Sequence, residues 1–281
     1  MSVIGEPAAR RDRPVGIFDS GVGGLSIVLE IRRQLPAEPV MYLADQANVP
    51  YGSQPLEVVR GYSQGITSFL LERNAKLIVV ACNTASAAAL RMLRERFPGT
   101  PFVGMEPAVK PAAEITRSKV VGVLATPATF QGELYASVVE RFTEGVRVLP
   151  STLPGLVEEI EAGNLRGEKT RAILEQAIRP LLAQGADTLV LACTHYPFVI
   201  PLIHEIAGPA IEVIDPSPAI ARQTARLLEK FELEIGAGAR GQTTYYTTGE
   251  VEILKRQLDN LGLGSGLVLK ARWSGGSLTA D

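Results

Sequence analysis

The chain has 281 residues and a formal net charge of −2, with 46% hydrophobic and 21% charged residues. These values are typical of a globular protein of one or two domains. They exclude an overall basic field that would attract nucleic acid or anionic lipid, so we expect neither as a partner.

The N-terminal segment 1–13 carries three arginines, but no apolar run follows them, which argues against a secretory signal. We expect this segment to be a short disordered tail. No stretch approaches the roughly 18 consecutive apolar residues of a membrane helix. The sequence therefore predicts a cytoplasmic protein without membrane association.

Short apolar runs rich in β-branched residues alternate along the chain with longer segments of helical periodicity. The expected strands are 15–18, 40–43, 77–81, 102–103, 120–124, 147–149, 188–192, 211–214, 243–247 and 267–271. The expected helices are 25–34, 58–73, one after the strand at 77–81, 168–184, 218–231 and 250–261. This alternation predicts an α/β fold with mostly parallel sheets flanked by helices.

Two pairs of segments repeat at nearly the same spacing. Residues 75–84 resemble 186–195, and residues 15–20 resemble 121–126. In the first pair, each strand-like run ends in Ala-Cys followed by polar residues. The repeats predict two similar, pseudo-symmetric α/β domains.

The predicted domain boundaries follow from these repeats. We expect residues 1–105 and 216–281 to form the first domain, and residues 106–215 to form the second. Open parallel sheets bind ligands beyond the carboxyl ends of their strands. The active site is therefore expected in the cleft between the two domains.

Cys82 and Cys193 each stand just after a repeated strand. Inverting an amino acid at its α-carbon removes a proton from one face and returns one to the other, which two groups on opposite faces do directly. A thiol with a pKa of about 8.5 can serve as either base or acid. A single cysteine here would be interpreted as a core thiol, but the pair predicts a two-thiol acid/base site.

Other cysteine chemistry is less well supported. The chain has no C-x-x-C motif, which argues against a thiol-disulfide protein. The close-spaced ligand pairs of structural zinc sites are also missing. We therefore predict no metal.

Polar residues flank both cysteines. His195 follows Cys193 by two positions and titrates near neutral pH, so it could share that thiol's proton. Asp19 ends the first strand and could serve Cys82 in the same way, or act as a turn acid. The loop Gly21–Gly24 offers backbone N–H groups to an anion, for which a carboxylate is the simplest candidate.

Four parts of the sequence together resemble the glutamate racemases, over about residues 14–217. They are Ile17–Leu25, Tyr42–Asp45 with Pro50–Gly52, Ala81–Ser86 and Ala192–Pro197. Cys-Asn-Thr-Ala-Ser followed later by Cys-Thr-His-Tyr-Pro is a highly specific combination. Ala192 stands where glycine is common in that family.

The resemblance implies catalytic roles. Cys82 would deprotonate D-glutamate with support from Asp19, and Cys193 would deprotonate L-glutamate with support from His195. A further family acid stands in a Val-Glu context, and Glu158 matches it best.

Other roles are less sharply fixed. The neighbouring Glu159 and Glu161 remain alternatives to Glu158, and Asp45 matches a further supporting acid. The expected substrate contacts are Asp19, Ser20, Tyr51, Gly52, Asn83, Thr84, Thr126, Thr194 and His195.

The family also implies a reaction without any cofactor, a homodimer, and a role in supplying D-glutamate for peptidoglycan. Two alternatives stay open from the sequence. Aspartate racemases share the fold, so aspartate could be the substrate. A non-catalytic regulatory binding protein is the alternative of another class.

Overall fold

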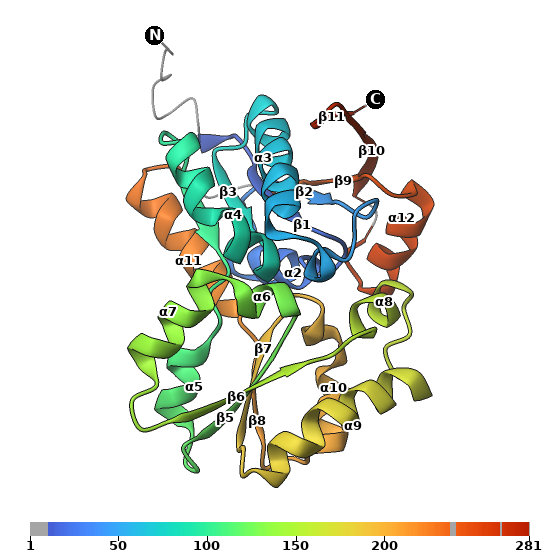
Figure 1. Ribbon diagram of the computed structural model, residues 1–281. Coiled ribbons are helices and arrows are strands. Elements are labelled where there is room, and N and C mark those ends of the chain that lie inside the picture. Colours follow the sequence, from blue (N-terminus) through green and yellow to red (C-terminus); the bar gives the residue numbers. More distant parts are fainter. Residues whose placement is uncertain (1–10, 237–239, 265, 281) are drawn as a thin grey trace.

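The computed structural model describes residues 11–236, 240–264 and 266–280. These residues form two β-sheets, one of seven strands and one of four, each covered by helices on both faces (Figure 1). In Figure 1 the larger sheet lies in the upper half and the smaller one in the lower half. The predicted α/β fold with mostly parallel sheets flanked by helices is confirmed.

The larger sheet has the strand order β11-β10-β9-β2-β1-β3-β4, and only β11 runs antiparallel to its neighbour. Its strands are β1 (Val15–Asp19), β2 (Val40–Ala44), β3 (Leu77–Val80), β4 (Phe102–Gly104), β9 (Thr243–Thr247), β10 (Leu267–Ser274) and β11 (Ser277–Ala280). Side chains alternate between two hydrophobic clusters, because successive residues of a strand point to opposite faces. One face packs against α2 (Leu25–Gln34), α11 (Ser217–Lys230) and α12 (Val251–Asn260), the other against α3 (Leu56–Glu72) and α4 (Asn83–Arg96).

The smaller sheet has the strand order β6-β5-β7-β8 and is parallel throughout. Its strands are β5 (Val120–Ala125), β6 (Arg147–Thr152), β7 (Thr188–Ala192) and β8 (Glu212–Ile214). One face packs against α5 (Val109–Ile115) and α7 (Glu133–Phe142), the other against α8 (Leu156–Glu161), α9 (Glu168–Ala183) and α10 (Ile200–Ala207). The short helix α6 (Pro127–Gln131) follows β5, and the 3₁₀ turns η1 (Tyr51–Ser53) and η2 (Tyr196–Val199) lie near the boundary between the sheets.

The two sheets repeat one pattern of strands. The order β2-β1-β3-β4 in the larger sheet matches β6-β5-β7-β8 in the smaller one, and all these pairings are parallel. The cysteine-bearing strands β3 and β7 occupy equivalent places beside the central strands β1 and β5. The segment from β9 to β11, which includes α12, extends only the larger sheet.

Arg11, the first described residue, contacts the larger sheet's half of the molecule. Of the predicted tail 1–13, residues 1–10 lie outside the described residues. The carbonyl oxygen of Arg11 accepts a hydrogen bond of 2.6 Å from the buried Lys76 ammonium, which also pairs with Glu38. Among the described helices, none has the length and apolar character that crossing a membrane requires.

Candidate active site

Cys82 and Cys193 line one small cavity between the two sheets. Cys82 follows β3 and caps α4, its Sγ accepting a 3.5 Å hydrogen bond from the Ala85 backbone. Cys193 follows β7, and both thiols are free and nearly buried. The cavity is also lined by Ser20, Pro50, Tyr51, Gly52, Asn83, Thr84, Thr126, Val157, Thr194 and His195.

We call this site closed because its cavity has almost no free volume. Its volume is about 10 Å³, which is hardly enough for one water molecule. In this structure the cavity therefore has no room for an amino acid. Every predicted substrate contact except Asp19 lines this cavity, and Asp19 lies directly behind it.

Asp19 lies behind Cys82 in a fully buried position. Its Oδ2 accepts backbone hydrogen bonds from Gly21 (3.3 Å) and Gly24 (3.0 Å), and its Oδ1 accepts one from the Thr194 hydroxyl (3.2 Å). Burial, and next the charge of Asp19, raise the pKa of Cys82 well above its usual value. In the closed site Cys82 is therefore a neutral thiol at pH 7.

Cys193 has a basic neighbour instead. Its Sγ lies 3.9 Å from Nδ1 of His195, whose Nε2 lies 2.6 Å from Oε1 of Glu161. Burial lowers the pKa of His195, but its hydrogen bonds to Cys193 and Glu161 outweigh burial and raise that pKa well above the usual value. For Glu161 the two effects have the opposite signs. Burial raises its pKa, but its contacts with His195 lower that pKa overall. The closed site thus holds an imidazolium beside Cys193, paired with a carboxylate.

The acid that contacts His195 is Glu161, whereas the sequence favoured Glu158. Glu158 is exposed and lines a neighbouring cavity of about 170 Å³. Glu159 forms a 2.6 Å ion pair with Lys169. The structure does not bring Glu158 to either thiol. Glu161 ends α8, at the helix terminus that faces the larger sheet, which the Val-Glu motif alone does not reveal.

The glycine-rich loop after β1 binds carboxylates, but they belong to the protein. The Val22 backbone N–H donates to Glu161 Oε1 at 2.7 Å. A Cβ on Gly21 would overlap the Glu161 carboxylate, and one on Gly23 would lie 2.5 Å from His195 Nδ1. The absence of side chains here lets the two halves of the site approach closely.

Asp45 supports a wall of the cavity from behind. Its carboxylate accepts hydrogen bonds from the Tyr51 hydroxyl (2.6 Å), the Thr248 hydroxyl (2.8 Å), the Trp273 indole (2.8 Å) and the Asn48 amide (3.0 Å). Burial, and next the Asp45 charge, raise the pKa of Tyr51 well above its usual value. Asp45 therefore fixes the turn at Tyr51 and does not itself line the cavity.

Two polar features of the cavity can recognise a substrate. Asn83 is buried, and neither polar atom of its amide has a hydrogen-bond partner among the described residues. Thr84 and Thr126 approach each other from the two halves, with their hydroxyls 2.9 Å apart. A buried amide without partners is costly unless a ligand satisfies it. Asn83 is thus a group that a carboxylate or an ammonium would satisfy.

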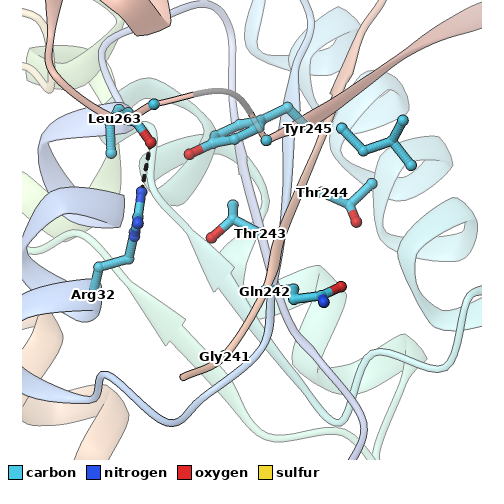
Figure 2. A pocket seen from close by; sticks show the side chains of 10 residues that line it. Arg32, Gly241, Gln242, Thr243, Thr244, Tyr245 and Leu263 are labelled. Atoms are coloured by element: carbon cyan, nitrogen blue, oxygen red, sulfur yellow. Dashed lines mark hydrogen bonds between the residues drawn. The ribbon is translucent and has the colours of Figure 1, made fainter. Parts of the chain in front are cut away.

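A larger cavity of about 450 Å³ lies away from the thiols, beside β9 (Figure 2). Arg32 lies on one side of it and donates a 2.7 Å hydrogen bond to the carbonyl oxygen of Leu263. No predicted site residue lines this cavity. Cys82, Cys193 and His195 instead line the small cavity between the sheets.

Residues 20–224 match the Asp/Glu/Hydantoin racemase family, and the chain belongs to that family. Over 250 residues it is 51% identical to the glutamate racemase of Pseudomonas paraeruginosa, covering 89% of this chain and 94% of that one. The family membership confirms the predicted resemblance and assigns the chain to the racemases, a class of isomerases.

Solved structures agree with this assignment. A glutamate racemase isoform from Bacillus anthracis superposes with a TM-score of 0.85 at 29% identity, covering 95% of this chain and 99% of that one. The Escherichia coli glutamate racemase, solved with L-glutamate and an activator, superposes with a TM-score of 0.80 at 31% identity, covering 96% and 99%.

Proposed function

We propose that this racemase interconverts L- and D-glutamate by proton transfer between Cys82 and Cys193. The observation that carries the proposal is that both thiols line one cavity, each from a different sheet. The glutamate racemases at 51% and 31% identity support glutamate as the substrate. Supplying D-glutamate for peptidoglycan is the corresponding biological role.

The two thiols exchange roles with direction. With L-glutamate, the Cys193 thiolate takes the α-proton, and the electron pair left on carbon is delocalised into the α-carboxylate. The Cys82 thiol then donates its proton to the opposite face of the carbon, giving D-glutamate and a Cys82 thiolate. The reverse reaction uses Cys82 as base and Cys193 as acid, so that no net proton is consumed.

His195 and Asp19 support these transfers from behind the thiols. His195, held by Glu161, lies 3.9 Å from Sγ of Cys193 and can share the proton that this thiol takes up or gives away. Asp19 has a different effect on Cys82, because its carboxylate disfavours a second anion. The α-ammonium of the bound substrate supplies a positive charge beside Cys82, which favours the thiolate there only when substrate is present.

The substrate contacts come from polar groups already aimed at the cavity. The free amide of Asn83 and the hydroxyls of Ser20, Thr84 and Thr194 offer donors to the two carboxylates. Closure over the substrate excludes water, which strengthens these contacts as charge develops at the α-carbon.

The remaining organisation is also part of the proposal. Residues 1–105 with 216–281 act as one domain and residues 106–215 as the other, supported by the separate sheets of seven and four strands. The closed cavity of about 10 Å³ supports opening of these domains to admit substrate. A homodimer in the cytoplasm, working without a cofactor, follows from the family resemblance.

Circular dichroism of L- and D-glutamate, incubated with the purified protein, tests the function directly. We expect the signal to decay to zero from both enantiomers, and Cys82→Ser and Cys193→Ser each to lower kcat by about 10³-fold or more. Aspartate in place of glutamate tests the alternative substrate. Full activity in the double variant Cys82→Ser/Cys193→Ser would contradict the mechanism. A circular dichroism signal of glutamate that does not change with the wild type would contradict glutamate as the substrate.

A further inference from the structure

Glu161 belongs to the smaller sheet's half of the molecule, yet the larger sheet's half holds it in three places. The Val22 N–H donates to its Oε1 at 2.7 Å, Gln46 Nε2 donates to its Oε2 at 3.2 Å, and Gln257 Nε2 donates to its backbone oxygen at 2.8 Å. We propose that Gln46 and Gln257 are positioning residues that bind Glu161 when the domains close and so hold His195 in place beside Cys193. We call this pair of glutamines, with its hydrogen bonds to Glu161, the clasp. The inference rests on the proposed function, because it gives the clasp a task in that reaction.

The orientation of the Gln46 amide is fixed by its surroundings. The Gly249 N–H donates to Thr247 Oγ1 at 2.9 Å, and the Thr247 hydroxyl in turn donates to Gln46 Oε1 at 2.8 Å. The amide nitrogen must therefore point away from Thr247. It donates to both Glu161 and Gln257, the latter through Oε1 at 2.9 Å.

Gln257 uses both ends of its amide in the same clasp. Its oxygen accepts from Gln46 and its nitrogen donates to the carbonyl of Glu161, the last residue of α8. Gln257 lies on α12, which Figure 1 shows above α8 at the boundary between the two halves. The last four backbone carbonyls of a helix lack partners within it, so a donor here fixes the helix end.

The clasp comes partly from a segment with no counterpart in the smaller sheet. Thr247 ends β9 and Gln257 lies on α12, both beyond the residues 20–224 that match the family. A charge-assisted contact chain thus runs from the C-terminal extension through Glu161 to His195 and Cys193. Opening the cavity separates Glu161 from its three partners, and closing it restores them.

Removing the clasp should be visible at His195 without any substrate. The hydrogen bond that His195 donates to Glu161 is one of the contacts that raise the pKa of His195. If Glu161 is held less firmly, that pKa falls toward the ordinary value of about 6.5. The chain has only two histidines, and the other, His204, is exposed on α10, so proton NMR can follow both titrations separately.

The experiment compares Gln46→Leu, Gln257→Leu and the double variant with the wild type. We expect the His195 pKa to fall in each variant, the pH profile of kcat to shift with it, and kcat at neutral pH to fall roughly tenfold. The two glutamines bond each other, so the double variant should lose little more than either single variant. The matched control is Gln223→Leu, an exposed position on α11, which should leave both titrations unchanged.

The outcomes separate this inference from the proposed function. An unchanged His195 titration in both single variants overturns the clasp, whatever the activity. A fall of kcat with no shift in the pH profile also overturns it, because a merely structural role would give that result. If the wild type leaves glutamate unchanged, the function fails, while the titration of the free protein still decides whether the clasp exists. Gln46→Leu leaves α12 intact and so covers the case in which Gln257→Leu does not fold.

Discussion

The two cysteines occupy equivalent places in two similar sheets, but their neighbours have opposite charge. Cys82 lies beside the buried Asp19 carboxylate, whose charge helps to raise the pKa of the thiol. Cys193 lies 3.9 Å from His195, whose own pKa is raised by its contacts with Cys193 and Glu161. The repeated strands therefore place two thiols in equivalent positions, and the charged residues around them give the two thiols different electrostatic surroundings.

This difference suits a reaction in which one thiol must give up a proton while the other takes one. In the empty site, burial and the Asp19 carboxylate keep Cys82 a thiol, whereas Cys193 faces the positive charge of His195. In the proposed mechanism, L-glutamate requires Cys82 in this thiol state. In the same mechanism D-glutamate requires a Cys82 thiolate, which the positive charge of the substrate ammonium favours.

The largest test of this asymmetry is His195→Asn. We expect kcat to fall by about 10²- to 10³-fold, because Cys193 loses the neighbour that shares its proton. Asp19→Asn should instead lower the pKa of Cys82, measured as thiolate absorbance against pH in the Cys193→Ser background. His204→Asn on the exposed face of α10 serves as the control and should keep wild-type activity. If the pKa of Cys82 does not change in Asp19→Asn, Asp19 does not control that thiol.

The same histidine gives a pH dependence of stability. A group whose pKa is raised on folding stabilises the protein fully below its unfolded pKa, here about 6.5, and this contribution disappears as the pH rises through the folded pKa. Glu161 stays ionised over that range because its pKa is lowered. The wild type should therefore exceed His195→Asn in free energy of unfolding most clearly near pH 6, with the difference shrinking toward pH 9. Urea denaturation at a series of pH values measures this trend, and a difference that grows with pH would contradict it.

A smaller effect is expected where the two halves touch. In Gly23→Ala, the new Cβ would lie 2.5 Å from both His195 Nδ1 and Thr194 Oγ1, so the closed site must widen. We expect kcat to fall by roughly tenfold while the melting temperature changes little, because the clash exists only on closure. Gly61→Ala is a matched control, since nothing lies within 4 Å of its Cβ on the exposed side of α3. Equal activity of the two variants would show that closure needs no glycine at position 23.

Several features of the site could be predicted because they are local in sequence. Each cysteine follows an apolar strand, and Asn83, Thr84 and His195 come within two residues of a cysteine. One short motif therefore predicts both the strand and the polar residues after it. The helix Leu25–Gln34 and the strand Thr188–Ala192 have the predicted bounds for the same reason.

The rest depended on contacts between distant segments. Helices α5 and α8 have seven and six residues, too few for helical periodicity to stand out, and β11 has only four. Which glutamate of α8 reaches His195 depends on where that helix ends relative to the other sheet. Gln46 and Gln257 lie 211 positions apart, and no local pattern links them.

The smallest predicted effect concerns the extension that only the larger sheet carries. The indole of Trp273 on β10 donates to Asp45, and Asp45 holds Tyr51 at the cavity wall. Trp273→Phe removes one hydrogen bond to a charged group and should lower the free energy of unfolding by about 2 kcal/mol. It should change kcat less than threefold, because three other donors still hold the Asp45 carboxylate. Urea denaturation beside the circular dichroism assay measures both quantities. A fall of kcat as large as in Gln257→Leu would contradict this prediction. The C-terminal extension would then support the cavity wall at Tyr51 as strongly as it supports His195 beside Cys193.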